Sequence, residues 1–260
     1  MSRLAIDAVS RTFPGGRRHA PTVALEPTTL TVADNDFISI LGPSGCGKST
    51  LLRIVAGLDA PTSGRVFLDG APVSAPGADR GMVFQSYTLF PWLTVRQNIC
   101  FGLREKGVPQ ARQDEIAARY VERVGLRGFE NHYPKMLSGG MQQRTAIARA
   151  LANEPKILLL DEPFGALDNQ TRSLMQELLL SIWESDRKTV LFVTHDIEEA
   201  IFMANRVVVM SARPGRIKAE VAVTLAHPRH YTVKTTPAFS ELKAQLTEEI
   251  RVEAQRAQIA

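Results

Sequence analysis

Apolar residues in this sequence follow two alternating patterns. Short apolar runs of strand length occur at Phe37–Leu41, Ile157–Leu160, Thr189–Val193 and Arg206–Met210. Between them lie longer segments in which apolar residues recur every three or four positions, as on one face of a helix. Strands that alternate with helices in this way favour an α/β fold, in which helices cover a parallel sheet.

Segments around this alternation predict further elements. Residues 4–32 have a strand-like pattern, and Arg65–Gly70 is typical of a strand that runs into a turn. Residues 86–152 form a helical insertion, in which Thr94 can cap one helix and Gln110–Val124 fits a second.

Helices and one more strand are expected towards the C-terminus. The pattern over Thr171–Trp183 predicts a helix with Leu174, Leu178, Leu179 and Ile182 inward. Arg216–Val223 is expected to be a strand. Ile197–Ala204 is a short helix, and the tail Ser240–Ala260 alternates charged and apolar residues as one exposed helix would.

Composition narrows the class of protein. The 260 residues can form one large domain or two small ones, and 44% of them are hydrophobic. The net charge of +4 is mild and its basic residues are scattered, so we expect no nucleic-acid partner. No apolar stretch reaches membrane-spanning length, and no secretory signal is seen at the N-terminus. Cys46 and Cys100 lack metal-ligand spacing and indicate two free thiols in a reducing compartment.

The segment that follows Phe37–Leu41 fits the phosphate-binding P-loop pattern G-x-x-x-x-G-K-[ST]. Its glycines let successive backbone N–H groups face one anion, at the start of a helix. Lys48 can then reach the β- and γ-phosphates, and the Ser49 hydroxyl can bind Mg²⁺. We therefore expect a nucleoside triphosphate on these residues: Gly42, Pro43, Ser44, Gly45, Cys46, Gly47, Lys48, Ser49 and Thr50.

Polar residues at the ends of other predicted strands suit the chemistry of hydrolysis. Asp161 and Glu162 follow a buried strand, so Asp161 can hold Mg²⁺ through water and Glu162 can activate a water as general base. His195 follows the next strand and can hydrogen-bond a γ-phosphate, although a lone histidine is more often a surface or core residue. Gln85 also follows a predicted strand and can act in the same way, but the argument for its role is weaker.

A second anion site is expected at Ser138, Gly139 and Gly140, which expose backbone N–H groups just before another helix. One nucleotide does not need two such sites from one chain. Two copies arranged head-to-tail, with each P-loop completed by the partner's Ser-Gly-Gly segment, would use both and bind two nucleotides.

These motifs, taken together and in this order, resemble the ATP-binding subunit of an ABC transporter. The Walker A motif corresponds to Gly42–Thr50, the Q-loop glutamine to Gln85 and the signature to Leu137–Gln142. Walker B corresponds to Ile157–Asp161 followed by catalytic Glu162, the D-loop to Ala166–Asp168, and the switch histidine to His195.

The resemblance implies a single ABC ATPase domain: a P-loop NTPase core, an N-terminal antiparallel β part and an inserted helical subdomain. Residues 1–85 and 153–225 would form the core, 86–152 the helical subdomain and 226–260 a short tail. ATP and Mg²⁺ are the implied cofactors, with Ser49, Gln85 and Asp161 at the metal. Phe13 lies where the family has an aromatic residue that stacks on adenine, although a core position is the alternative reading.

A finer resemblance points to the nitrate, sulfonate and taurine importers, on segments such as Pro76–Gly81, Leu89–Trp92 and Ser211–Ile217. It implies a subunit at the cytoplasmic face of the membrane, whose partners are a second copy, an integral membrane permease and, indirectly, a substrate-binding protein. Phe90 and Trp92 would dock the permease or simply pack the helical insertion.

Other classes of ATPase fit less well. DNA-repair members of the family insert a very long coiled coil between P-loop and signature, translation members carry two cassettes, and a small-molecule kinase has no use for the signature. A subunit of an exporter is a further alternative. The transported solute is not specified by this sequence.

Overall fold

The computed structural model describes residues 2–16 and 20–259. The chain divides into two compact units. The first unit joins Met1–Gly77 to Arg187–Ala260, and the second is Ala78–Asp186. The second unit is therefore an insertion between two halves of the first.

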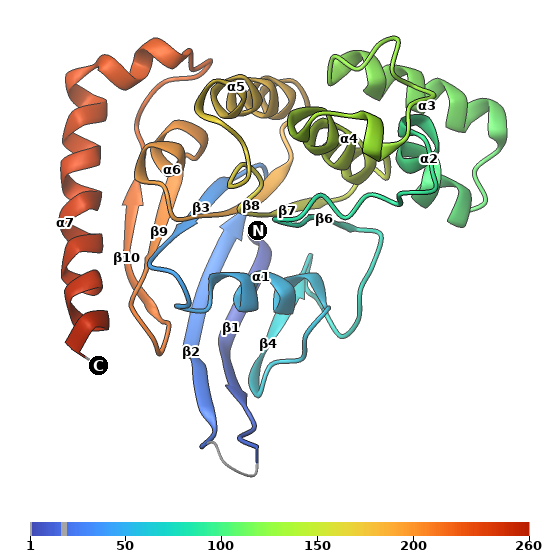
Figure 1. Ribbon diagram of the computed structural model, residues 1–260. Helices are drawn as coiled ribbons and strands as arrows, with labels where there is room; N and C mark the ends of the chain where they lie inside the picture. Colours follow the sequence, from blue (N-terminus) through green and yellow to red (C-terminus); the bar gives the residue numbers. More distant parts are fainter. Residues whose placement is uncertain (1, 17–19, 260) are drawn as a thin grey trace. The chain divides into compact units, whose positions relative to one another are not determined.

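An antiparallel sheet forms the N-terminal part of the first unit (Figure 1). Its strand order is β2-β1-β4-β5, and β1 pairs with β2 on one side and β4 on the other. Thr28, Leu30 and Val32 alternate with exposed residues, because one face of this sheet is covered and the other faces solvent. The strands are β1 (Ser2–Phe13), β2 (Thr22–Ala33), β4 (Ser63–Leu68) and β5 (Ala71–Pro72).

Buried, mostly parallel strands form the rest of the first unit's sheet structure, in the order β10-β9-β3-β8. All residues of β3 and β8 are buried, which explains why these strands read as continuous apolar runs. β3 is parallel to β8 and β9, as the predicted parallel sheet requires, whereas the edge strand β10 is antiparallel to β9 and departs from that prediction. The strands are β3 (Phe37–Leu41), β8 (Thr189–Thr194), β9 (Arg206–Met210) and β10 (Ile217–Ala222).

Helices of the first unit follow directly from these strands. α1 (Lys48–Ala56) comes after β3, and α6 (Ile197–Met203) comes after β8. α7 (Pro237–Ile259) runs along the edge strands and contacts α6 and β9 (Figure 1). Phe239, Leu246 and Glu253 of α7 are buried, so the predicted tail helix packs one stripe against the unit and is not exposed all round. Ala260, the last residue of that prediction, lies outside the described residues.

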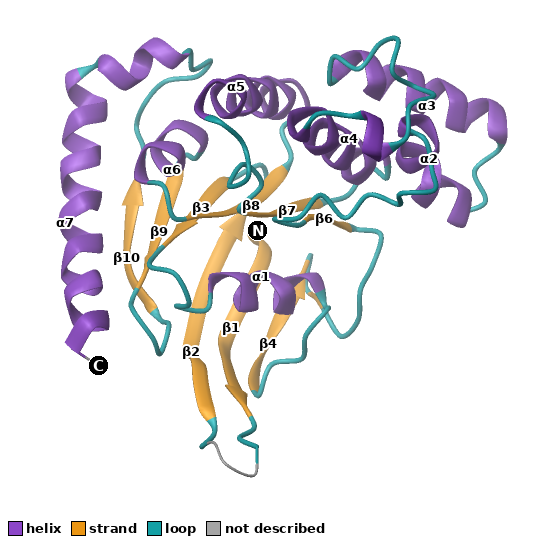
Figure 2. Ribbon diagram, viewed as in Figure 1, coloured by secondary structure: helices purple, strands orange, loops and turns teal. Residues whose placement is uncertain are grey.

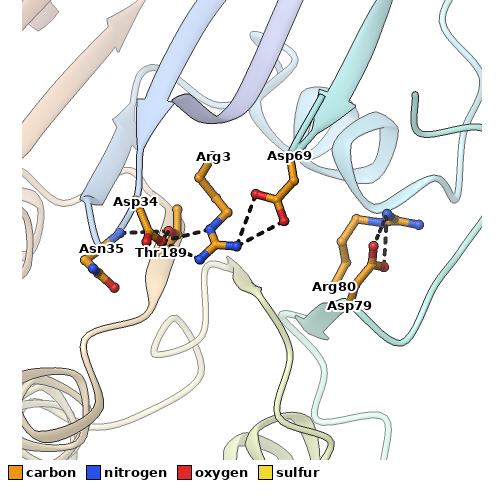
Figure 3. Close-up of polar contacts among 7 residues, drawn as sticks. All are labelled: Arg3, Asp34, Asn35, Asp69, Asp79, Arg80 and Thr189. Atoms are coloured by element: carbon orange, nitrogen blue, oxygen red, sulfur yellow. Dashed lines mark hydrogen bonds and ion pairs between the residues drawn. The ribbon is translucent and has the colours of Figure 1, made fainter. Parts of the chain in front are cut away.

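Arg3 holds the first strand to two turns of the first unit (Figure 3). Its guanidinium donates to Asp34 Oδ1 at 2.6 and 2.8 Å, and to both carboxylate oxygens of Asp69 at 3.1 Å. The Thr189 hydroxyl also donates to Asp34, at 3.4 Å, which links the start of β8 to the same cluster. A planar guanidinium can serve two carboxylates at once because its donors diverge.

The second unit contains two parallel strands and the helices α2 to α5 (Figure 2). Asp79 and Arg80 form an ion pair at 3.0 Å where its first strand begins (Figure 3). The elements are β6 (Arg80–Val83), α2 (Val95–Glu105), α3 (Gln110–Arg123), α4 (Gly139–Ala152), β7 (Ile157–Asp161) and α5 (Asn169–Asp186).

The α/β fold class is confirmed, as are the main predicted helices. Thr94 caps α2 through a reciprocal capping box with Gln97. The prediction that Leu174 points inward is wrong: its side chain is 57% exposed, and the neighbouring Met175 and Gln176 are buried instead. Among the described helices, none has the length and apolar content needed to cross a membrane.

Candidate functional site

The predicted P-loop connects β3 to α1 in the first unit. Gly45 and Gly47 have φ angles of 74° and 99°, in the left-handed region that glycine adopts without strain. Gly47 is the N-cap of α1, and within the described chain no side chain caps this helix. The first N–H groups of α1 are therefore suited to an anionic ligand, which is the usual partner of such a helix start.

Lys48 points back into the P-loop rather than into solvent. Only 4% of its surface is exposed, and Nζ donates to the carbonyl oxygens of Gly42 at 2.8 Å and Pro43 at 2.9 Å. A buried ammonium group requires such hydrogen bonds. They hold the positive charge inside the loop, where a phosphate would meet it.

The rest of the loop is split between buried support and exposed polar groups. Cys46 is fully buried, and Gly42 is packed so closely that a Cβ there would lie 3.0 Å from Cys46 Sγ and 3.1 Å from the Met210 carbonyl oxygen. Ser44, Gly45 and Ser49 are exposed. Hydroxyl and backbone groups of the loop can therefore reach a ligand while the apolar side of the loop faces the core.

His195 lies in the first unit, immediately after β8, and its side chain is exposed. A hydrogen-bonded turn fixes the backbone beside it. The Thr194 hydroxyl donates to Glu199 Oε2 at 2.5 Å and accepts the Asp196 N–H at 3.0 Å, and Asp196 Oδ1 accepts the Glu199 N–H at 3.0 Å. Thr194 and Glu199 are both buried.

Phe13 is the last residue of β1, and 38% of its surface is exposed. The Arg11 guanidinium lies 4.7 Å from the centre of its ring. This exposure excludes the alternative reading of Phe13 as a core residue. The ring is therefore partly exposed, with the Arg11 guanidinium over it.

Gln85 and Glu162 are brought together in the second unit. They follow β6 and β7, which are parallel neighbours, so their side chains meet at the carboxyl ends of the strands. Gln85 Nε2 donates to Glu162 Oε2 at 3.5 Å. Asp161 is the last residue of β7 and is half-buried. Three of the predicted hydrolysis residues therefore lie at one edge of the second unit's sheet.

Glu162 has a φ angle of 43°, in the left-handed region. A non-glycine residue there costs about 1–2 kcal/mol, and such strain gathers at functional sites. Gly165, three residues later, is near the same carboxylate, because a Cβ on it would lie 3.8 Å from Glu162 Oε2 and 3.8 Å from Gln85 Nε2.

Ser138 lies before α4 in the second unit and is exposed. Its Oγ accepts the Met141 N–H at 3.3 Å, so it acts as the N-cap of α4. The two glycines after it lie close to neighbouring side chains: a Cβ on Gly139 would lie 2.8 Å from the Tyr87 hydroxyl, and one on Gly140 2.7 Å from Thr171 Cγ2. The segment is thus a tightly packed helix start with an exposed serine.

The aromatic segment of the second unit contains one packed ring and one exposed ring. Phe90 packs inward against Phe101, with ring centres 4.2 Å apart. Trp92, whose ring centre is 5.8 Å from that of Phe90, is 69% exposed. Phe90 is therefore a packing residue and Trp92 an exposed apolar side chain.

Glu199 was missed by sequence reasoning, although it is buried beside the segment that carries His195. A signal for it was available: Asp196 followed three residues later by Glu199 matches the spacing of a helix-capping pair. Gly215 was likewise noted only as part of a family-like segment. Nothing in the sequence pattern indicates that it touches the P-loop.

Comparison with known proteins gives a match to the family model described as "ABC transporter", over residues 25–165. The matched residues include the P-loop, Gln85, the signature segment and Glu162. The chain belongs to the ABC transporter family.

Several curated relatives of this ABC transporter ATP-binding protein match most of the chain. An uncharacterised ABC transporter ATP-binding protein of Methanocaldococcus jannaschii is 58% identical over 80% of this chain and 78% of its own. The nitrate import ATP-binding protein NrtD of Synechocystis is 48% identical, and the aliphatic sulfonates import ATP-binding protein SsuB of Bacillus cereus is 46% identical. Each of these two matches spans 95% of this chain and 95% of the relative.

Solved structures similar to this ABC protein are ATP-binding cassettes. One is a dimeric cassette in a post-hydrolysis state bound to ADP and phosphate, with a TM-score of 0.75 and 36% identity over 86% of this chain and 100% of that one. A second dimeric structure of a bacterial ABC transporter cassette gives a TM-score of 0.76 at the same identity and coverage. The fold is that of an ABC ATPase, and the chain is an ATP-binding ATPase of this family.

Proposed function

We propose that this chain is the ATP-hydrolysing subunit of an importer for a small anionic or zwitterionic solute of the sulfonate, taurine or nitrate class. The observation that carries the proposal is its similarity to nitrate and sulfonate import proteins at 48% and 46% identity over 95% of both chains. Similarity along almost the whole length includes segments outside the ATPase motifs. Such segments are where subfamilies of one ATPase differ.

The P-loop residues Gly42–Thr50 bind the triphosphate in this proposal. The exposed backbone around Gly45 and the open start of α1 supply N–H donors, and Lys48 supplies the positive charge. The Phe13 ring stacks on adenine, which its 38% exposure permits.

Mg²⁺ accompanies the nucleotide, with the Ser49 hydroxyl, the Gln85 amide oxygen and the Asp161 carboxylate as its protein partners. These are hard oxygen donors of the kind that Mg²⁺ prefers, and Gln85 and Asp161 follow neighbouring parallel strands. When bound, the metal neutralises charge on the phosphate oxygens.

Glu162 is the general base that takes a proton from the attacking water. Gln85 lies within 3.5 Å of this carboxylate and orients it or the water, and His195 hydrogen-bonds the γ-phosphate. The positive φ of Glu162 supports this role, because backbone strain in a non-glycine residue persists where a specific side-chain direction is required.

Two copies of the chain act together, head to tail. The Ser138–Gly140 segment of one copy meets the nucleotide on the P-loop of the other, so ATP joins the copies and hydrolysis releases them. The dimeric state of the similar cassettes supports this arrangement.

The pair is peripheral to the cytoplasmic face of the membrane, on a permease that is a separate chain, and a substrate-binding protein delivers the solute to that permease. The exposed Trp92 contributes to the docking surface. Residues 1–85 and 153–225 serve as the nucleotide-binding core, 86–152 as the coupling subdomain and 226–260 as the tail.

Affinity capture of the tagged chain from detergent-solubilised host membranes, followed by mass spectrometry, tests the importer assignment. A polytopic permease among the captured proteins is the expected result. Trp92→Ala should lower its recovery, whereas Leu174→Ala, which also removes an exposed apolar side chain, should not. Recovery of ribosomes or DNA-repair factors without a membrane protein would contradict the proposal.

Uptake of radiolabelled solutes by host cells tests the solute class. Cells that carry Glu162→Gln should lose uptake of one sulfonate, taurine or nitrate, and cells with the unaltered chain should retain it. Unchanged uptake of all three by the variant would exclude this solute class.

A further inference from the structure

The loop between β9 and β10, residues Ser211–Arg216, is built into the first unit beside β2. The Gly215 N–H donates to the Ala24 carbonyl at 3.0 Å, and the Glu26 N–H donates to the Gly215 carbonyl at 2.9 Å. Both backbone polar groups of Gly215, the N–H and the carbonyl, are therefore hydrogen-bonded to β2.

Gly215 also lies directly against the P-loop. A Cβ at this position would be 1.9 Å from the carbonyl oxygen of Cys46 and 3.1 Å from Met210 Cε. The obstructing atom at Cys46 belongs to the backbone, so it cannot rotate away as the end of a long side chain could. The φ of Gly215 lies outside the left-handed region, so the need for glycine comes from lack of space alone.

β2 supports the next residue of the P-loop in the same way. A Cβ on Gly47 would lie 2.7 Å from Leu25 Cδ2 and 2.8 Å from the Ala24 carbonyl oxygen. Cys46 and Gly47, which lead into α1, thus rest on one layer made of Ala24, Leu25 and Gly215. Any displacement of this layer would move the P-loop backbone.

The C-terminal helix α7 holds the loop in place. The Ala212 N–H donates to Glu253 Oε2 at 2.9 Å, and Glu253 is only 1% exposed. Lys218 Nζ, on β10, pairs with Glu253 Oε1 at 3.3 Å. Within the loop, the Ser211 hydroxyl accepts the Arg216 N–H at 3.0 Å. A continuous set of contacts therefore runs from α7 through the loop to Cys46.

We propose that Gly215 and Glu253 are positioning residues for ATP binding: α7 holds the Ser211–Arg216 loop through Glu253, and Gly215 holds the P-loop through Cys46. The inference rests on the proposed role of the P-loop. Neither residue touches the nucleotide. Because N–H groups that face one phosphate act only when they are correctly spaced, a shift of the loop lowers ATP affinity without removing any ligand group.

Titration calorimetry with ATP on the full chain tests this role. Gly215→Ala and Glu253→Leu should each raise the Kd for ATP by about tenfold or more, since displaced binding groups lose much of their effect. Glu249→Leu is the matched control, because Glu249 lies on the same helix and pairs with the same Lys218 Nζ, at 2.9 Å. It should leave the Kd unchanged.

The two cysteines supply a readout that separates loop displacement from general loss of stability. Both are buried, and burial raises the pKa of the Cys100 thiol. In Gly215→Ala and Glu253→Leu, iodoacetamide should modify Cys46 at least several times faster than in the unaltered chain. Cys100, in the second unit, should be modified at the same rate as in the unaltered chain. Glu253→Leu carries the test if Gly215→Ala does not fold.

The outcomes are distinct. Weaker ATP binding with selective exposure of Cys46 supports the proposal. If Lys48→Ala loses ATP affinity while Gly215→Ala and Glu253→Leu bind as the unaltered chain does, the positioning role is overturned and the P-loop assignment stands. An equal rise in modification of both cysteines overturns it too, because the substitutions then act on global stability. Unchanged affinity in Lys48→Ala overturns the P-loop assignment and this inference together.

Discussion

The side-chain amide of Gln85 donates to the carboxylate of Glu162 across 3.5 Å, although 77 residues separate the two in the chain. The contact exists because β6 and β7 are parallel neighbours and each residue lies just past the end of its strand. Since parallel strands present their carboxyl ends at one edge, side chains from distant segments converge there. The proposed general base and its neighbouring amide therefore meet at this edge.

Glu162→Gln should abolish most ATP hydrolysis. The amide keeps the size of the carboxylate and its contact with Gln85, but it cannot accept a proton from water. We expect the rate of phosphate release to fall by about 100- to 10,000-fold, the usual contribution of a general base. ATP affinity should be retained, and light scattering should detect a dimer that accumulates with ATP.

Glu154→Gln provides the control for that substitution. Glu154 is also a glutamate with a positive φ, 51°, in the second unit, and its side chain pairs with Arg119 at 3.3 Å. The Glu154→Gln variant should hydrolyse ATP at the same rate as the unaltered chain. Rapid turnover by Glu162→Gln would show that another group is the base.

The convergence of Gln85 and Glu162 could be expected from sequence, whereas the support of the P-loop could not. The ends of strands can be located in the sequence because apolar runs stop at identifiable polar residues. The approach of Gly215 to Cys46 depends on how a loop folds back on β2, and no periodicity encodes it. Leu174 shows a related limit: a helical stripe predicts that one face is buried, but Met175 and Gln176 take that face.

Lys48→Ala should weaken ATP binding strongly. The substitution removes the only formal positive charge of the predicted loop, which the carbonyls of Gly42 and Pro43 hold in place. Hydrogen bonds between charged groups contribute about 1.5–3 kcal/mol, so we expect a Kd at least tenfold higher by calorimetry. Arg53→Ala on the same helix, whose side chain pairs with Asp59, should bind ATP normally.

Thr194→Val should lower the rate of hydrolysis more than it changes ATP affinity. Valine keeps the shape of threonine but removes the hydroxyl that joins Glu199 and the Asp196 N–H beside His195. Thr194→Ser, which retains the hydroxyl, should restore the rate. Equal loss of kcat in the serine and valine variants would mean that the methyl group, and not the hydrogen bonds, positions this turn.

Asp168 should give the protein an acid-dependent component of stability. Its carboxylate accepts the N–H groups of Thr171 at 3.0 Å and Gln170 at 3.1 Å, at the start of α5, and these bonds hold its pKa below the usual range. A carboxyl group whose pKa is lower in the folded than in the unfolded chain stabilises the fold at pH values above its unfolded pKa of about 3.9. This contribution is lost as the pH falls through the folded pKa.

Asp168→Asn tests this linkage by urea unfolding at several pH values. The variant should be less stable than the unaltered chain near neutral pH, and the difference should shrink between about pH 5 and pH 2, where the aspartate becomes protonated. A difference that stays constant over this range would mean that the carboxylate charge does not contribute.

Arg229 should be a strong determinant of stability, because it closes the C-terminal end of α6. Its Nη1 donates to the carbonyl oxygens of Ile201, Phe202 and Ala204 at 2.9, 3.0 and 2.7 Å, and its Nη2 donates to that of Leu225 at 3.0 Å. The last carbonyls of a helix lack partners within it, and a positive charge there is attracted to the negative end of the helix dipole.

Arg229→Met should therefore lower the free energy of unfolding by about 2 kcal/mol or more, because several carbonyls lose a charged donor at a site that is only 6% exposed. Arg251→Met is the matched control, since Arg251 pairs with Glu248 on the exposed side of α7 and surface pairs contribute little. Equal loss of stability in the two variants, measured by urea unfolding, would contradict this reading of Arg229. A loss confined to Arg229→Met would place the tail among the elements that hold α6, the helix next to His195.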